Sequence, residues 1–278
     1  MNGQEGPTSY TPLDSATAGL PSFYENPIKV PRPVPTFLNS TELVTFHIGA
    51  AKTTFLVQKE VATFYSRVLE AAFNSDFIEG QTQTYTLEDV DEGVFKLFIQ
   101  WLYRQRFGYY LNQAEADLLR QPESHTEEQL KAVKDKIEKR QELLVRLWVL
   151  GDRLSIAHLQ NLVVDELENI RFTWNTTVPL HLLEEVYENT VEECRLRKFL
   201  LLHVKSFLPK DVLKEHVEVI PKTFLLDYAL TSHVYLDWSN RECFRRSFHI
   251  PVFEVYEEED EEYESETSSQ GYFGHGFR

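Results

Sequence analysis

Residues Gly49 to Thr53 (Gly-Ala-Ala-Lys-Thr) have the composition of a phosphate-binding loop, but the segment lacks parts that this chemistry needs. Such a loop requires a glycine directly before the lysine, because backbone amides must surround the phosphate. Ala51 stands at that position, before Lys52. A strand is also predicted after the segment, where the motif needs a helix. We therefore predict a hairpin turn here and no nucleotide site.

Three other places hold reactive residue types without the partners that chemistry requires. His181 is followed by Glu184 and Glu185, which resembles the start of a zinc-enzyme helix, but no second histidine completes a ligand pair. A helix with its acidic residues facing water is the simpler prediction. Ser66 lies outside any Gly-x-Ser-x-Gly motif, so we expect a helix cap or a buried hydroxyl. Cys194 follows two acidic residues, which disfavour a reactive thiolate. We predict no catalytic residue, cofactor or metal ligand, and no enzyme.

Charge separates the end of the chain from the rest. The 278 residues carry a net charge of -16, and 42% of them are hydrophobic. From Glu257 to Arg278 there are eight acidic residues and one basic residue, a net charge of -7, so -9 is spread over the remainder. An acidic chain is a poor ligand for nucleic acid, since binding depends on cations that neutralise phosphates. We therefore expect protein partners and no nucleic acid.

The two cysteines, Cys194 and Cys243, fit neither a disulfide framework nor a metal ligand set. They are expected to be reduced thiols of an intracellular protein, in the cytoplasm, the nucleus or both. Residues 1–19 lack the basic start and apolar run of a signal peptide. No stretch approaches the roughly 18 apolar residues that span a bilayer, so no membrane association is expected.

Composition and hydrophobic spacing divide the chain into six predicted segments. They are a proline-rich disordered leader (1–38), a compact core (39–110), a polar connection (111–126), helices that complete the core (127–175), a helical extension (176–256) and a disordered acidic tail (257–278).

The core segment is predicted to mix strands and helices, which makes the fold class α+β. Two strands at 43–48 and 54–57 should form a hairpin, and a third strand should cover 82–87. Between them, 59–73 has helical spacing and is expected to form two short helices broken near Ser66. After Asp91, a suitable N-cap, the helix around 94–102 is apolar on most sides and must therefore be central to a core.

The rest of the chain predicts helices only. A long amphipathic helix runs from about 130 to 148, and Lys131, Lys134, Lys136 and Lys139 are expected on its solvated face rather than in a nucleic-acid patch. Further helices are predicted at 156–170, 178–189, 192–208, 210–217, 221–230 and 239–247, with Pro179 in the first turn of one of them.

Residues 43–107 resemble the BTB domain, also called the POZ domain, throughout its length. Its hairpin ends in a Val-His-Lys-like triplet, with a serine eight residues past the histidine. The matching residues here are Val57-Gln58-Lys59 and Ser66. Next come a Phe-x-Glu-Gly-like step, a strand with an Asp-Val step, and the end of a helix. These are matched by Phe77-Ile78-Glu79-Gly80, Tyr85-Thr86-Leu87-Glu88-Asp89-Val90 and Trp101-Leu102-Tyr103.

Later segments are similar to BTB proteins of filamentous fungi, so the resemblance covers roughly 40 to 210. They are 147–154, 158–161, 186–190 and the Leu196-Arg197 pair. The resemblance implies a BTB/POZ fold, in which a short β-hairpin and a third strand pack against a helix cluster, followed by an all-α C-terminal extension. Two departures matter. Gln58 replaces the familiar histidine, and the prolines at 31, 33 and 35 stand where many animal members have the arm that they exchange in a dimer.

The resemblance implies a non-enzymatic adaptor that joins proteins. One branch of the family docks on cullin scaffolds of ubiquitin ligases through an apolar-x-Glu step, which Phe77 and Glu79 match. The alternative for these two residues is that Phe77 closes the domain's own core and Glu79 begins a turn. Two alternatives for the chain also stay open. They are a self-associating scaffold unrelated to ubiquitin, and an enzyme of unrecognised class, which would need a deep cleft lined by titratable groups.

Overall fold

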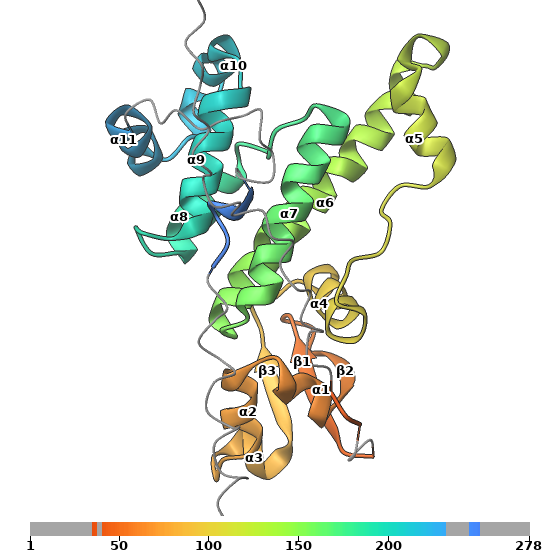
Figure 1. The fold of residues 1–278 in the computed structure, drawn as a ribbon, viewed down its shortest axis with the longest axis vertical. Coiled ribbons are helices and arrows are strands. Elements are labelled where there is room, and N and C mark those ends of the chain that lie inside the picture. Colours follow the sequence, from red (N-terminus) through yellow and green to blue (C-terminus); the bar gives the residue numbers. More distant parts are fainter. Residues whose placement is uncertain (1–34, 38–40, 232–244, 251–278) are drawn as a thin grey trace, which may run out of the picture. The chain divides into compact units, whose positions relative to one another are not determined.

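The computed structural model describes residues 35–37, 41–231 and 245–250. The acidic tail, nearly all of the leader and most of the helix predicted at 239–247 lie outside these residues. Figure 1 shows the arrangement of the elements.

The sheet contains the predicted hairpin and one further strand. β1 (Leu43–Ile48) pairs antiparallel with β2 (Thr53–Gln58), and β3 (Thr84–Leu87) pairs parallel with β1, in the order β2-β1-β3. Gly49 in the connecting turn has a φ of 70°, a conformation that glycine adopts without steric cost. Because a strand follows this turn directly, the segment is a hairpin turn, as predicted.

The two faces of the sheet differ in exposure. Val44, Phe46 and Ile48 point to one face and are at most 1% exposed. Leu43 and Leu56 are 50% and 61% exposed on the other face. Successive side chains of a strand alternate between faces, so a single strand contributes both to the core and to an apolar outer surface.

Ser66 separates the first two helices, α1 (Lys59–Phe64) and α2 (Arg67–Phe73). Its hydroxyl accepts a hydrogen bond from the Leu69 amide at 3.1 Å and donates one to the Leu154 carbonyl at 2.7 Å. The side chain is 1% exposed. The residue is thus both a helix cap and a buried hydroxyl. It also ties α2 to a carbonyl 88 residues further along the chain.

Helix α4 (Glu92–Arg104) is central, as its composition predicts. The Asp91 side chain caps it by accepting the Gly93 amide at 2.7 Å. The helix lies between the sheet and the long helices that follow it (Figure 1). Its buried residues are Val94, Phe95, Leu97, Phe98, Trp101 and Leu102. Phe95 contacts Phe46 of the sheet with a ring-centroid distance of 5.1 Å.

The long helices are α6 (Glu127–Arg153) and α7 (Ala157–Trp174), which pack against each other. The segment predicted only as a polar connection, 111–126, contains helix α5 (Gln113–Arg120) and a 3-10 turn, η1 (Pro122–Ser124). Hydrophobic spacing did not reveal α5 because it has no fully buried residue.

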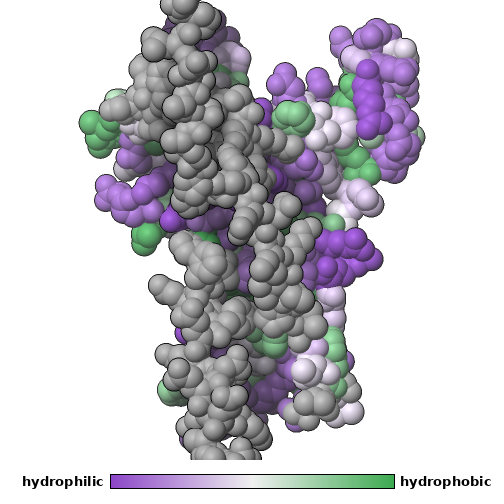
Figure 2. Space-filling view, in the orientation of Figure 1, coloured by the Kyte–Doolittle hydropathy of each residue, from purple (hydrophilic) through white to green (hydrophobic). Residues whose placement is uncertain are grey.

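Polar interactions hold α5 in place. Asn112 and Glu115 form a capping box, in which each side chain accepts the other residue's backbone amide. Glu115 also pairs with Lys136 of α6. The lysines of α6 are exposed, as predicted, and Lys139 pairs with Glu142 of the same helix at 3.0 Å. The surface over α5 and the start of α6 is largely hydrophilic in Figure 2.

The described part of the extension is helical. It contains α8 (Leu182–Asn189), α9 (Arg195–Phe207), α10 (Lys210–Glu215), the 3-10 turn η2 (Val217–Val219) and α11 (Lys222–Leu230). The mixed α+β class is therefore confirmed for the described residues, with one small sheet and mostly helices.

Helix α8 begins later than predicted. Pro179 precedes the helix instead of lying in its first turn, and its carbonyl accepts the Leu182 amide at 3.2 Å in a turn. The turn ends the extended segment that leaves α7, so the helix starts only after it.

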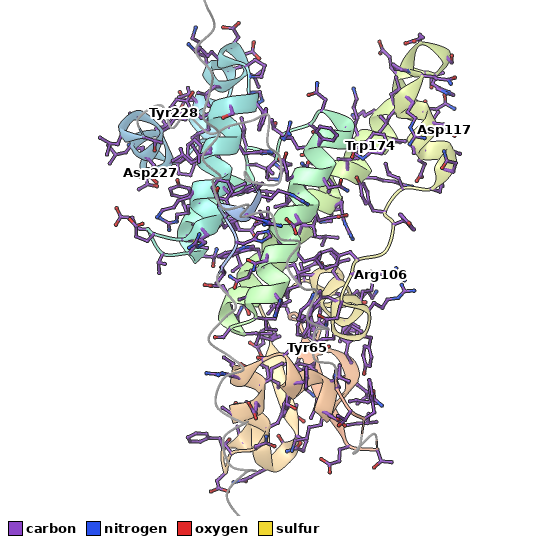
Figure 3. The ribbon with its side chains drawn as sticks, viewed as in Figure 1. Tyr65, Arg106, Asp117, Trp174, Asp227 and Tyr228 are labelled. Atoms are coloured by element: carbon purple, nitrogen blue, oxygen red, sulfur yellow. The ribbon has the colours of Figure 1, made fainter. Side chains whose placement is uncertain are left out.

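Arg197 of α9 connects helices of the extension. It donates to the Tyr187 carbonyl at 2.6 Å and to the Thr190 hydroxyl at 2.8 Å, and its guanidinium lies 4.4 Å from the centre of the Tyr187 ring. The Tyr187 hydroxyl donates to Asp227 at 2.8 Å, on the helix where Figure 3 labels Asp227. Burial, together with this hydrogen bond, raises the pKa of Tyr187. These contacts of Tyr187 and Arg197 thus hold α8, α9 and α11 together.

Candidate functional site

The step from Phe77 to Gly80 forms an exposed apolar surface at α3 (Ile78–Thr82), which follows α2 after a short turn. Phe77 is the N-cap of this short helix and is 75% exposed, and Ile78 is 65% exposed. Glu79 is partly buried in the first turn. A side chain this exposed does not close the core, so the alternative assigned to Phe77 is wrong. Glu79 does begin a helical turn, as that alternative had it.

Gly80 explains how the step is held in this orientation. A Cβ atom at this position would lie 1.8 Å from the Ser75 carbonyl oxygen and 3.2 Å from the Ala72 carbonyl oxygen. Only glycine permits this close approach of two backbone segments. The Ser75 hydroxyl donates to the Ala72 carbonyl at 2.9 Å and accepts the Phe77 amide at 3.3 Å. The turn before α3 is therefore packed tightly while the side chains after it face solvent.

Gln83 closes the other end of α3. It has a φ of 50°, which ends the helix, and its side-chain amide donates to the Phe73 carbonyl at 2.9 Å. The Phe73 carbonyl also accepts from Lys59 at 3.2 Å. These contacts attach α3 to α1 and α2, so Phe77 and Ile78 sit on a supported element.

The surface combines apolar area with negative charge. Two carboxylates, Asp76 and Glu79, flank the exposed pair in sequence, and Asp76 is itself exposed. Exposed apolar side chains with a charged rim are typical of sites that bind other proteins. The arrangement suits a partner with an apolar slot and hydrogen-bond donors beside it.

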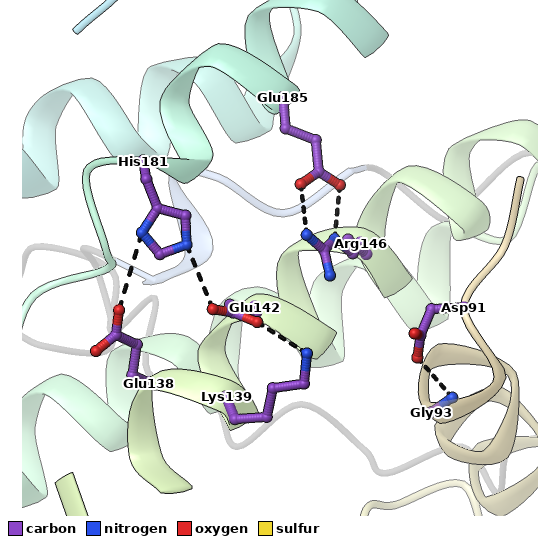
Figure 4. Close-up of polar contacts among 8 residues, drawn as sticks. All are labelled: Asp91, Gly93, Glu138, Lys139, Glu142, Arg146, His181 and Glu185. Atoms are coloured by element: carbon purple, nitrogen blue, oxygen red, sulfur yellow. Dashed lines mark hydrogen bonds and ion pairs between the residues drawn. The ribbon is translucent and has the colours of Figure 1, made fainter. Parts of the chain in front are cut away.

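The reactive residue types singled out in the sequence lie in different environments. Ser66 and Cys194 are buried, at 1% and 8% exposure. Glu184 faces water, as predicted. Glu185 is only partly exposed, and both of its carboxylate oxygens accept from Arg146 of α6, at 2.7 and 2.9 Å (Figure 4). The hydrogen bonds that Arg146 donates to Glu185 raise the pKa of Arg146. The prediction holds only in part for Glu185, because its partner lies 39 residues away on another helix.

One cleft brings titratable groups together. Glu166 lies 3.9 Å from Arg140, whose guanidinium stacks near the Phe107 and Tyr110 rings. Tyr110 also accepts a hydrogen bond from Trp174 at 2.7 Å, near the end of α7 (Figure 3). Burial raises the pKa of Glu166, although Arg140 opposes the shift. The cleft beside them has a volume of about 350 Å³. These contacts attach the chain before α5 to α6 and α7.

A second polar cluster was not anticipated from the sequence. His181 lies between two glutamates of α6, with Nδ1 3.8 Å from Glu138 and Nε2 3.3 Å from Glu142 (Figure 4). The spacing of the glutamates, four residues apart on one helix face, is visible in the sequence. Their approach to His181 depends on how α8 packs on α6, which spacing along the chain does not reveal.

No family model matches the chain, and no curated protein is significantly similar to it. Among the described helices, none has both the length and the apolar character needed to cross a bilayer. The described residues therefore place the chain in a fold class only. It is a mixed α+β fold with a small three-stranded sheet and a cluster of helices.

Proposed function

We propose that this chain is a BTB-type adaptor that joins proteins without catalysing a reaction. The order of elements supports the proposal: a hairpin, a helix pair, a short helix, a third strand parallel to the first, and a central apolar helix. The residues quoted for the resemblance also have definite roles. Ser66 caps α2, Gly80 permits a close backbone approach, and Arg197 locks the helices of the extension.

The observation that carries the proposal is the exposure of Phe77 and Ile78 on a rigidly attached helix. These side chains do not contribute to the core of the chain. When a partner buries such an apolar side chain, the free energy falls by about 25 cal/mol for each Å² removed from water. In the proposed complex, Phe77 fills an apolar slot on a cullin scaffold. Glu79 accepts hydrogen bonds at the rim, and the helices after residue 176 hold the target of a ubiquitin ligase.

A pull-down with a cullin N-terminal domain tests this function. The double variant Phe77→Asp, Glu79→Lys should lower binding by about tenfold or more, since residues at the centre of an interface each contribute about 2 kcal/mol or more. Tyr109→Asp is a matched control, because Tyr109 is fully exposed, at 103%, and belongs to the segment before α5. Circular dichroism checks that each variant is folded. Unchanged binding by the double variant, or no binding by the wild type, rejects the cullin contacts.

A self-associating scaffold is the second candidate, and a different surface favours it. Leu43 and Leu56 expose apolar area on the outer face of the hairpin. In the described part of the chain, β2 is an edge strand and pairs with no strand but β1. A strand of a second copy would add along its other edge. Residues 36 and 37 hydrogen-bond to Glu60 of α1, at 2.8 and 2.6 Å. The prolines at 31, 33 and 35 stand where other members have the arm that they exchange in a dimer. The proposed self-association therefore does not involve an exchanged arm.

Light scattering at several concentrations separates this candidate from the first. If the hairpin face associates, the average mass should rise with concentration, and Leu56→Lys should keep the chain monomeric. The Phe77→Asp, Glu79→Lys variant should associate like the wild type, because its substitutions lie on a different surface. A wild type that stays strictly monomeric discards self-association and leaves the adaptor proposal in place.

A further inference from the structure

The cluster at the start of α8 contains three groups that transition metals prefer as ligands. Glu138 and Glu142 lie one turn apart on α6, and His181 approaches them from the N-terminal end of α8 (Figure 4). One ligand atom from each residue can be chosen so that all three lie within 4.8 Å of one another. The ligands therefore converge from two helices that are separated by a turn, a further helix and an extended segment.

One distance in the cluster already matches the separation that a bound ion would impose. Zinc bonds to imidazole nitrogen and to carboxylate oxygen are about 2.0 to 2.2 Å long, so ligands around one ion lie roughly 3.4 Å apart. His181 Nε2 and Glu142 Oε1 are already separated by 3.3 Å. Glu138 must move toward Nε2. Its side chain is 50% exposed, so it can rotate without disturbing the core.

The charges of the cluster also favour a cation. One oxygen of Glu142 pairs with Lys139 at 3.0 Å, which leaves the other oxygen directed to His181. For Glu138, His181 is the only ion-pair partner within the described residues. Two carboxylates four residues apart on one helix repel each other unless a cation lies between them. With a neutral imidazole, the form that binds metal, Lys139 compensates only one of them.

We propose that Glu138, Glu142 and His181 form a binding site for a divalent transition metal, with Zn²⁺ as the best-suited ion. The two carboxylates and the imidazole supply three ligands, and water completes a tetrahedral set. The bound ion joins the first residue before α8 to the middle of α6. It therefore strengthens the attachment of the extension next to the Arg146–Glu185 pair. The site has no part in the Phe77 surface, so either proposal can fail without the other.

Calorimetric titration of the metal-free full-length chain with Zn²⁺ tests the site. We expect binding that His181→Ala and Glu138→Gln each weaken by about tenfold or more, the loss typical of damage to a metal site. Two matched controls should bind Zn²⁺ like the wild type. His216→Ala removes an exposed histidine of the extension, and Glu128→Gln removes an exposed glutamate from the first turn of α6.

A second measurement locates the bound ion and keeps the test independent of small folding defects. Zn²⁺ should raise the melting temperature of the wild type and of both controls, and should raise that of His181→Ala much less. Absence of binding at millimolar Zn²⁺ would overturn the proposal and leave only the contacts between His181 and the two glutamates. Equal Zn²⁺ affinity in the wild type and His181→Ala would overturn it as well, since the ion would then be bound elsewhere in the chain.

Discussion

Replacing His203 with phenylalanine should remove much of the acid sensitivity of this protein between pH 6.5 and 4.5. His203 of α9 is completely buried, at 0% exposure, and neither ring nitrogen has a hydrogen-bond partner in the described structure. Its ring stacks on Phe199 with a centroid distance of 5.1 Å and meets Phe207 edge-on at 5.4 Å. A neutral imidazole fits this apolar environment, and a protonated one does not.

The pKa of His203 sets the sign of the effect. Burial, with a smaller contribution from the nearby positive charge of Arg171, lowers this pKa from 6.5 to about 3. Glu168 lies 3.9 Å away and would favour the protonated ring, but both of its oxygens already accept hydrogen bonds from Arg171, at 2.6 and 2.8 Å. Below pH 6.5 the unfolded chain therefore binds a proton that the native chain excludes. Stability present above this pH is lost as the pH falls.

The expected slope is large enough to measure. One pKa unit corresponds to about 1.4 kcal/mol, so this residue alone should lower the free energy of unfolding by up to about 1.4 kcal/mol for each pH unit below 6.5. Urea unfolding at intervals from pH 7 to 4.5 measures the slope. We expect a flatter profile for His203→Phe and also for the smaller His203→Leu. The test is the slope of the free energy of unfolding against pH, and not its absolute value. Either substitution can change the free energy of unfolding equally at every pH by altering the packing.

An exposed histidine provides the control for this experiment. His216, the residue that follows α10, lies at the surface, where its ring bonds to the Val212 carbonyl at 2.9 Å. His216→Gln should keep the wild-type slope. If His203→Phe and the wild type lose stability in parallel from pH 6.5 to 4.5, the imidazole is not the cause of the acid sensitivity.

Ser66→Ala should destabilise the fold by about 2 to 4 kcal/mol. The substitution removes the cap of α2, a loss of about 1 kcal/mol. It also removes the donor to the carbonyl of Leu154, a residue that is itself 1% exposed. Losing a hydrogen bond to a buried group costs about 1 to 3 kcal/mol more. Denaturant unfolding at neutral pH measures the total.

A second cap in the same chain separates the two contributions. Thr126 caps α6 by accepting the Gln129 amide at 3.3 Å, and it is exposed to solvent. Thr126→Ala therefore removes a cap without burying an unpaired group, and should cost only about 1 kcal/mol. Equal losses for Ser66→Ala and Thr126→Ala would mean that the bond between α2 and the end of α6 contributes nothing to stability.

The hairpin, the helix pair and the central helix could be predicted because their signals are local. Alternation marks a half-buried strand, and apolar residues on most sides mark a helix that is covered on most sides. Ser66 and Asp91 cap helices where their types predicted it. Helix α5 was missed because its support is polar: a capping box and an ion pair to α6, with no buried residue of its own.

The candidate surface could be predicted only in part. The types of Phe77 and Glu79 indicated this surface. The residue type alone, however, does not show whether a phenylalanine is buried in the core or exposed for contact with a partner. The close approach of Gly80 to the Ser75 carbonyl turns the chain so that Phe77 lies outside. Likewise, Glu185 and His181 have partners on α6 that no nearby residue indicates.

The sequence by itself determined where most of the helices and strands form and which of their faces are apolar, because these depend on neighbours within a few residues. Only the tertiary structure decided which polar groups meet: Ser66 with Leu154, Glu185 with Arg146, and His181 with two glutamates. It also decided that the His203 ring nitrogens are buried without a hydrogen-bond partner among the described residues. Hydrogen bonds and ion pairs act over a few ångströms, so they depend on helices that packing brings together from distant parts of the chain.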